Sequence, residues 1–145
     1  MRDEESREVA VRRRPLSSRQ RALVALEGVV SLSGAAGGFY MATHPLTTMP
    51  LRYLEGTWFH TWRWPGLALF FFVGVVPSLV VLVTLQGRQV ANGGHLGVGL
   101  GLVAWIVLEA LWIVVAPLLQ ITFAVIGVVI FWLGLLEWRH ASPPT

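Results

Sequence analysis

The sequence predicts an all-α protein, an antiparallel four-helix transmembrane bundle with an outer interfacial segment between helices one and two. Four apolar runs, at about residues 22–41, 66–85, 95–115 and 118–137, are separated by short polar breaks. Each run is close to the roughly 20 helical residues that cross a bilayer core about 30 Å thick. The chain of 145 residues is also 54% hydrophobic and only 13% charged, where a soluble domain averages about 25% charged residues.

This pattern predicts one membrane domain with a short tail at each end. Residues 1–21 mix arginines with acidic residues and lack apolar periodicity, so we expect a mobile basic cytoplasmic tail. Residues 22–138 form the predicted four-span domain. Residues 139–145 form a second cytoplasmic tail.

The arginines predict the orientation. All eleven basic residues are arginine, and nine of the eleven precede the first run or follow the second and fourth runs. Only Arg52 and Arg63 lie in the long first connection, residues 42–65. By the positive-inside rule both termini are cytoplasmic and this connection lies outside. Exclusive use of arginine hints at a GC-rich bacterial genome, so the expected location is the bacterial plasma membrane.

The first span carries a face of small and polar residues. Glu27, Ser31, Gly34 and Gly38 follow the i, i+4, i+7, i+11 spacing of one helix face. Small residues allow helix backbones to approach closely in a membrane. We therefore expect Gly34 and Gly38 to line a helix contact.

The connection after this span is predicted to be an interfacial segment. Pro50 could open a helix that places Leu54, Trp58 and Trp62 on one face. With Trp64, these tryptophans predict an amphipathic segment along the outer membrane interface.

The second span has few polar features and is expected to be the most lipid-exposed, with a kink at Pro77. The third span repeats glycine at every fourth position, which predicts that Gly97 and Gly101 also pack against a partner helix. That partner is either the glycine face of the first span or another subunit.

Glu109 in the third span is the strongest functional candidate. A carboxylate inside a membrane is costly and is a functional-site hypothesis by default. Gln120, at similar depth in the fourth span, is placed to hydrogen-bond with it. Two alternatives stay open, a proton or cation site and a carboxyl that only holds helices together. Glu27 is the weaker candidate, with Arg19 and Arg21 within reach for a structural ion pair.

Several classes of site are not predicted. The chain has no cysteine, which excludes disulfides, thiolate metal sites and iron–sulfur clusters. The four histidines lie at span ends or in the outer connection, so no haem or metal site is expected. A metal held by His44, Glu55 and His60 is the weak exception. No Ser-His-Asp arrangement or phosphate loop is evident, and the placement of the arginines does not indicate nucleic-acid binding.

Several short motifs together resemble a family of small four-span membrane proteins, mostly actinobacterial and known mainly as hypothetical proteins. The resemblance covers roughly residues 22–137. It implies a four-helix bundle with an outer loop and no known activity. In such proteins a glutamine often stands at the position of Glu109 and a proline at that of Trp58. The motifs are Met49-Pro50-Leu51, Leu54 to Phe59, Pro65 to Phe70, Trp105-Ile106 with Glu109, and Leu118-Leu119-Gln120 leading to Gly127.

The leading functional hypothesis is a non-enzymatic scaffold or accessory subunit of a membrane complex, because no catalytic constellation is evident. Its expected partners are the lipid bilayer and either further copies of the chain or a larger complex, with no cofactor. The alternative is a small oligomeric transporter, or a proton or cation pathway, that uses Glu109. A lipid-modifying enzyme that uses Glu109 with His60 is the third and weakest interpretation.

Overall fold

The computed structural model describes residues 15–88, 90–112 and 117–141, and all regular structure in these ranges is helical. The helices are α2 (Ser18–Thr43), α3 (Arg63–Leu69), α4 (Val76–Leu85), α5 (Ala91–Trp112) and α6 (Pro117–Ala141). A short 3₁₀ helix, η1 (Leu51–Leu54), and a π-helical turn, η2 (Phe70–Val75), complete the set. The predicted all-α four-helix bundle is therefore confirmed.

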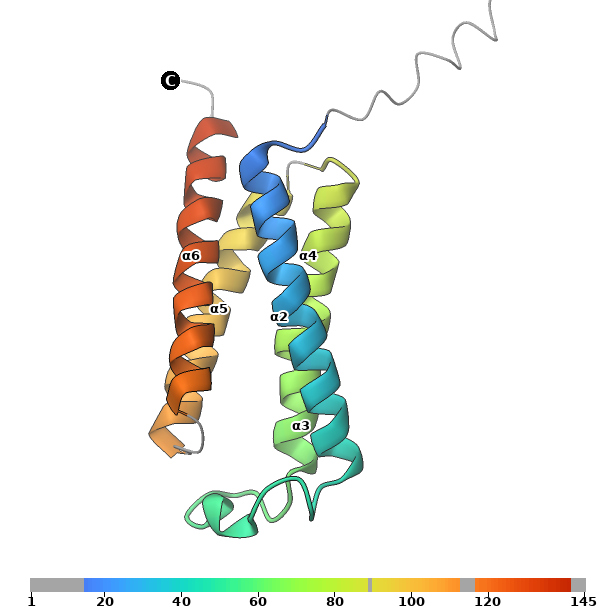
Figure 1. Cartoon of the computed structure of the whole chain (residues 1–145), viewed down its shortest axis with the longest axis vertical. Helices are drawn as coiled ribbons and strands as arrows, with labels where there is room; N and C mark the ends of the chain where they lie inside the picture. The colour runs from blue at the N-terminus through green and yellow to red at the C-terminus, as the bar shows by residue number, and fades with distance from the viewer. Residues whose placement is uncertain (1–14, 89, 113–116, 142–145) are drawn as a thin grey trace, which may run out of the picture.

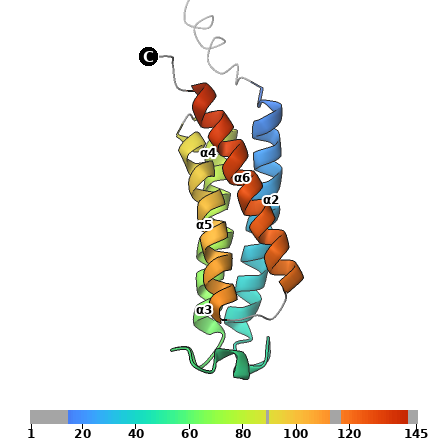
Figure 2. The ribbon, with the colours of Figure 1, turned by 90° about the vertical axis from the view of Figure 1, so that its left-hand side faces the viewer.

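Four of the helical stretches are long and apolar enough to cross a membrane. They are Ser18–Thr43, Arg63–Leu85, Ala91–Leu111 and Leu118–His140. The bundle has two ends (Figures 1 and 2). We call the end where α2 begins and α6 ends the terminal end, and the opposite end the loop end. These correspond to the predicted cytoplasmic and outer sides.

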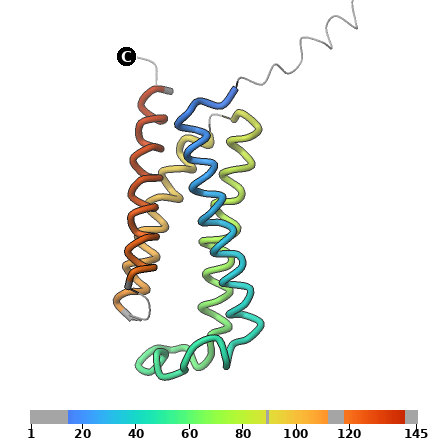
Figure 3. The backbone as a smooth tube through the Cα atoms, viewed as in Figure 1, coloured from blue at the N-terminus to red at the C-terminus, as the bar shows by residue number. Residues whose placement is uncertain are grey.

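The bundle consists of two helical hairpins. In the first hairpin, α2 packs along α3, η2 and α4, and in the second, α5 packs along α6. Figure 3 shows α3, η2 and α4 following one another as one continuous helical path. The hairpins meet through contacts of α4 with α5 and of α2 with α6. The core between them is apolar and consists of Leu23, Val30, Val73, Val98, Leu102, Ile106 and Ile130.

Helix α2 begins four residues before the predicted span because its first turn is capped. Ser17 Oγ accepts a hydrogen bond of 3.1 Å from the Gln20 backbone N–H. Gln20 Oε1 accepts one of 3.0 Å from the Ser17 backbone N–H. This capping box satisfies two donors that the first turn of a helix leaves without a partner.

The second span is less uniform than the sequence predicts. The irregularity expected at Pro77 is a π-helical turn over Phe70–Val75, directly before the proline that lacks a backbone N–H. Ser31 Oγ donates a hydrogen bond of 2.7 Å to the Gly74 carbonyl within this turn. The second span therefore has a polar, closely packed face toward α2, and the fourth span, which was not expected to be the most exposed, is the least buried of the four.

The connection between α2 and α3 folds back on itself into a cap at the loop end, residues 44–62, which we call the loop cap. Trp62 is 1% exposed, and its Nε1 donates a hydrogen bond of 3.0 Å to the Met49 carbonyl. The predicted amphipathic helix is limited to the single turn of η1. Gly56 adopts a φ of 82°, a left-handed conformation that ends helical structure there.

Candidate functional site

Three polar side chains from three helices meet inside the bundle, nearer its terminal end. Glu27 lies on α2, Thr84 on α4 and His95 on α5. His95 Nδ1 lies 2.8 Å from Glu27 Oε1, and both side chains are fully buried. His95 Nε2 lies 3.1 Å from Thr84 Oγ1, and Thr84 is 3% exposed. These three residues, which we call the buried triad, are the most enclosed polar group in the part of the chain that the structure describes.

Hydrogen bonds connect the three side chains of the buried triad. At 2.8 Å the Glu27–His95 contact requires one proton between carboxylate and imidazole. The Thr84 hydroxyl has a single hydrogen, which it donates either to the Val80 carbonyl at 2.8 Å or to His95 Nε2. Glu27 Oε2 is buried without a hydrogen-bond partner among the residues the structure describes. A carboxylate oxygen that is enclosed without a partner is costly to bury.

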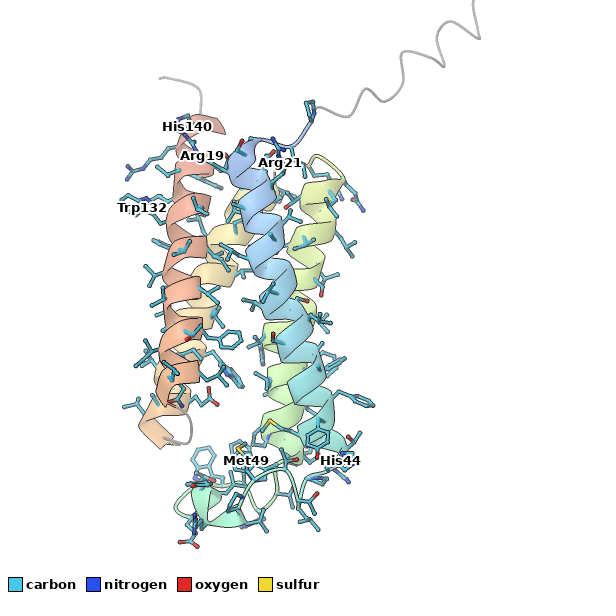
Figure 4. All side chains as sticks on the ribbon, in the orientation of Figure 1. Arg19, Arg21, His44, Met49, Trp132 and His140 are labelled. Carbon is cyan, nitrogen blue, oxygen red and sulfur yellow. The ribbon has the colours of Figure 1, made fainter. Side chains whose placement is uncertain are left out.

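Sequence reasoning found only part of this cluster. Glu27 was expected to pair with Arg19 or Arg21, but its partner is His95, while Arg19 Nη1 lies 3.3 Å from His140 Nδ1 at the terminal end. Figure 4 shows Arg19, Arg21 and His140 together at that end.

His95 was assigned to a span end because the start of the third span was placed four residues too late. A signal was present in the sequence. His95, Val98, Leu102 and Ile106 follow the spacing of one helix face, and all four are buried. Their periodicity places His95 on the core side of α5.

The buried triad repeats the order of acid, imidazole and hydroxyl that is found in serine hydrolases, where the acid contacts Nδ1 and the hydroxyl contacts Nε2. No motif in the sequence predicts this arrangement. A hydrolase also needs a place for the substrate beside the hydroxyl. Neither of the two cavities considered below includes a triad residue in its lining.

A second polar group lines a cavity toward the loop end. The cavity has a volume of about 430 Å³ and lies between the two hairpins, with the loop cap contributing Thr48 and Met49. Glu109 on α5 and Gln120 on α6 both line it, and Glu109 is half-buried. We call this space the loop-end cavity. The two polar residues that the sequence predicts at similar depth therefore border the same space, within walls that are mainly apolar.

A separate apolar groove of about 410 Å³ lies beside α5. Its lining includes Gly97, Gly101 and Ala104 of α5 and Val76 and Pro77 of α4.

Trp105 borders both spaces. Its indole Nε1 is buried and has no hydrogen-bond partner within the described ranges. Such a donor is costly to leave unpaired. Trp105 therefore supplies an unused polar atom at the wall between the groove and the loop-end cavity.

The predicted packing glycines divide into two groups. A Cβ on Gly34 would lie 2.7 Å from the Val73 carbonyl carbon, and one on Gly38 would lie 2.4 Å from the Phe70 nitrogen. Both glycines thus permit close packing of the first hairpin. A Cβ on Gly97 or Gly101 would meet no atom within 4 Å. Within this chain these two glycines therefore line no helix contact, and contact with another subunit stays a prediction.

The close contact of α5 is made instead by Gly99, where an added Cβ would lie 2.4 Å from the Phe131 nitrogen of α6. Two residues correspond to about 200° around a helix, so Gly99 faces almost opposite to Gly97 and Gly101. The glycines of α5 that pack against the neighbouring helix were therefore predicted on the wrong face of α5.

The three interfacial tryptophans also differ from one another. Trp58 is 88% exposed and Trp64 is 66% exposed. Trp62 is instead the buried anchor of the loop cap. No group of three His, Cys, Asp or Glu residues converges within the ranges that the structure describes, so His44, Glu55 and His60 do not form a metal site there.

The fold and the two polar groups define a class, a four-helix bundle with spans of membrane-crossing length. Compared with known proteins, the chain matches no family model, no curated protein and no solved structure. The functional argument therefore depends on the geometry of this chain.

Proposed function

We propose that the protein is a multipass protein of the bacterial plasma membrane with both termini in the cytoplasm. Two observations support this orientation. Four helices have membrane-crossing length and hydropathy. Arg19, Arg21, Arg88 and Arg139 lie around the terminal end of the bundle, whereas Arg52 and Arg63 lie near the loop end. This asymmetry follows the positive-inside rule.

The orientation predicts which cysteine variants an impermeant thiol reagent will label in intact cells. The chain has no cysteine of its own, so each introduced residue reports alone. Thr47→Cys, at an exposed position of the loop cap, will be labelled. Ser6→Cys and Ser142→Cys will be labelled only after the cells are permeabilised. Labelling of Ser6→Cys and Ser142→Cys, but not of Thr47→Cys, in intact cells would show that the termini lie outside.

We further propose that the loop-end cavity binds an apolar molecule that carries a positive charge, with Glu109 as the counter-ion. The observation that carries this proposal is the position of Glu109 and Gln120 on a cavity of about 430 Å³ with largely apolar walls. Ligand sites of this size commonly combine apolar walls with a few polar groups that orient the ligand. A carboxylate within a span is stabilised by a cation at short range. Such binding is the first step of the transporter or cation pathway that the sequence offered as an alternative.

Two ions of matched shape and opposite charge test this proposal. Purified protein in detergent at pH 8 is titrated with tetraphenylphosphonium and, separately, with tetraphenylborate, and binding is followed by equilibrium dialysis. We expect the cation to bind and the anion to bind at least about tenfold more weakly, which corresponds to about 1.4 kcal/mol. Glu109→Gln removes the charge at nearly constant shape and is expected to abolish this preference.

Glu137→Gln is the matched control, because Glu137 lies on α6 at the terminal end beside Ser17. This variant will keep the preference for the cation. Equal binding of both ions to the unmodified protein, or an unchanged preference in Glu109→Gln, would contradict the assignment of the cavity.

The second candidate function is the scaffold or accessory subunit that the sequence favours. One observation supports it, the apolar groove beside α5, where Gly97 and Gly101 have open space instead of a neighbour. An accessory subunit needs an unoccupied helix face of this kind. The binding experiment with the two ions separates the two candidate functions. A scaffold role does not predict a preference for the cation that depends on Glu109.

A further inference from the structure

Two basic side chains from different hairpins meet at the terminal end of the bundle. Arg19 lies in the first turn of α2 and His140 in the last turn of α6. Arg19 Nη1 lies 3.3 Å from His140 Nδ1, and Figure 4 shows both residues at this end. Arg19 is half-buried, whereas His140 is exposed. The contact therefore lies at the surface of the bundle, where a ligand can reach it.

A second contact of His140 shows which atom carries a hydrogen. His140 Nδ1 lies 2.6 Å from the carbonyl oxygen of Leu136, one turn earlier on α6. A carbonyl oxygen only accepts hydrogen bonds, so Nδ1 must carry the hydrogen and donate it. The guanidinium of Arg19 also only donates. The contact between Arg19 and His140 thus brings two donors together without an acceptor between them.

The charges around this contact favour an anion as the missing acceptor. Arg19 has no carboxylate within 4.0 Å among the residues that the structure describes. The acid on this part of α6 is Glu137, whose Oε1 accepts a hydrogen bond of 3.2 Å from Ser17 Oγ. Arg21 on α2 and Arg139 on α6 flank the contact along the chain and are exposed. Three guanidinium groups and one carboxylate give this corner of the bundle a net positive charge.

An exposed apolar stripe on α6 leads to the same corner. Val125, Val128 and Trp132 are each more than half exposed, and together with His140 they follow the spacing of one helix face. Figure 4 shows Trp132 pointing away from the bundle. A tryptophan near the end of a span is typical of a membrane interface. A ligand that combines apolar chains with an anionic group fits both the stripe and the guanidinium of Arg19.

We propose that the phosphate of an anionic phospholipid binds Arg19 at the terminal end, with its acyl chains along the exposed stripe of α6. The phosphate oxygens supply the acceptor that His140 cannot supply, and a guanidinium binds phosphate through two parallel hydrogen bonds. Arg21 and Arg139 add attraction at longer range. Lipid binding here requires the proposed insertion in a membrane and is independent of the ligand at Glu109.

Native mass spectrometry of the purified protein in detergent measures this binding. The protein is titrated with phosphatidylglycerol and, separately, with phosphatidylcholine of the same acyl chains, in which the choline cancels the charge of the phosphate. We expect phosphatidylglycerol to bind at least about fivefold more tightly. Arg19→Gln removes the charge and the paired donors, and we expect it to reduce this preference to about twofold or less.

Arg88→Gln is the matched control. It removes the same charge at the terminal end, but from the connection between α4 and α5 instead of the contact between α2 and α6. This variant is expected to keep the preference for phosphatidylglycerol. A large excess of inorganic phosphate is expected to leave the lipid bound, because inorganic phosphate cannot cover the apolar stripe.

Three outcomes would overturn the lipid site. The first is equal binding of the two lipids to the unmodified protein. The second is an equal loss of preference in Arg19→Gln and Arg88→Gln, which would indicate a general effect of surface charge. The third is displacement of the lipid by inorganic phosphate, which would indicate a site for a soluble anion. None of these outcomes depends on the cation preference tested at Glu109.

Discussion

Replacing Glu27 by leucine is expected to lower the free energy of unfolding by about 3 kcal/mol. Removing one partner of a buried ion pair typically costs about 3–5 kcal/mol, because the other partner stays buried without compensation. We expect the lower end of this range, since a neutral imidazole left without its partner loses only a hydrogen bond. Unfolding of the purified protein in mixed detergent micelles, followed by circular dichroism, measures the change.

A double variant provides the sharper comparison. In Glu27→Leu with His95→Leu both polar groups are gone, and replacing a whole buried pair by apolar residues is often neutral or stabilising. The double variant should therefore be more stable than Glu27→Leu alone. Val29→Leu, at an exposed position of the same helix, is the matched control and should change stability by less than about 0.5 kcal/mol. Additive losses in the double variant would show that the two side chains do not interact.

The second large effect is expected at Gly99. A Cβ there would lie 2.4 Å from the Phe131 nitrogen and 2.8 Å from the Gly127 carbonyl oxygen, so the obstacle is backbone that cannot rotate away. Gly99→Leu must separate α5 from α6, and we expect a loss of about 3 kcal/mol or more, at or above the usual range for overpacking. The same unfolding measurement applies.

Gly101→Leu is the matched control for this prediction. It lies two residues further along α5, and an added Cβ would meet nothing within 4 Å. The substitution is expected to leave the free energy of unfolding almost unchanged. If Gly101→Leu proved more damaging than Gly99→Leu, the face of α5 that packs on α6 would be wrongly assigned.

The fold could be predicted from the sequence because hydropathy alone reports spans of sufficient length. The sequence does not predict which helix packs against each helix face. Gly97 and Gly101 form a regular repeat, yet the close contact is made by Gly99, which faces the other way. A repeat of small residues shows that a backbone can be approached closely on that side. It does not show which helix approaches, because that choice depends on the packing of all four helices.

The candidate site could likewise be predicted only in part from the sequence. Glu27 and Glu109 stand out because a carboxylate in an apolar run is rare, and Gln120 follows from its depth. His95 was missed because the sequence around it, with Asn92, Gly93 and Gly94, is typical of a turn. The structure extends α5 through these residues, which makes His95 a fully buried position of that helix.

The loop cap determines how a molecule could reach Glu109. Trp62 fastens the cap through its hydrogen bond of 3.0 Å to the Met49 carbonyl, and Thr48 and Met49 line the adjoining cavity. Figure 4 shows Met49 at this end of the bundle. In the proposed membrane orientation the cap lies between the cavity and the external water, so we expect a ligand to enter from the acyl chains. Occupancy would then follow how strongly a compound partitions into the bilayer, and two compounds at equal aqueous concentration would fill the cavity to different extents.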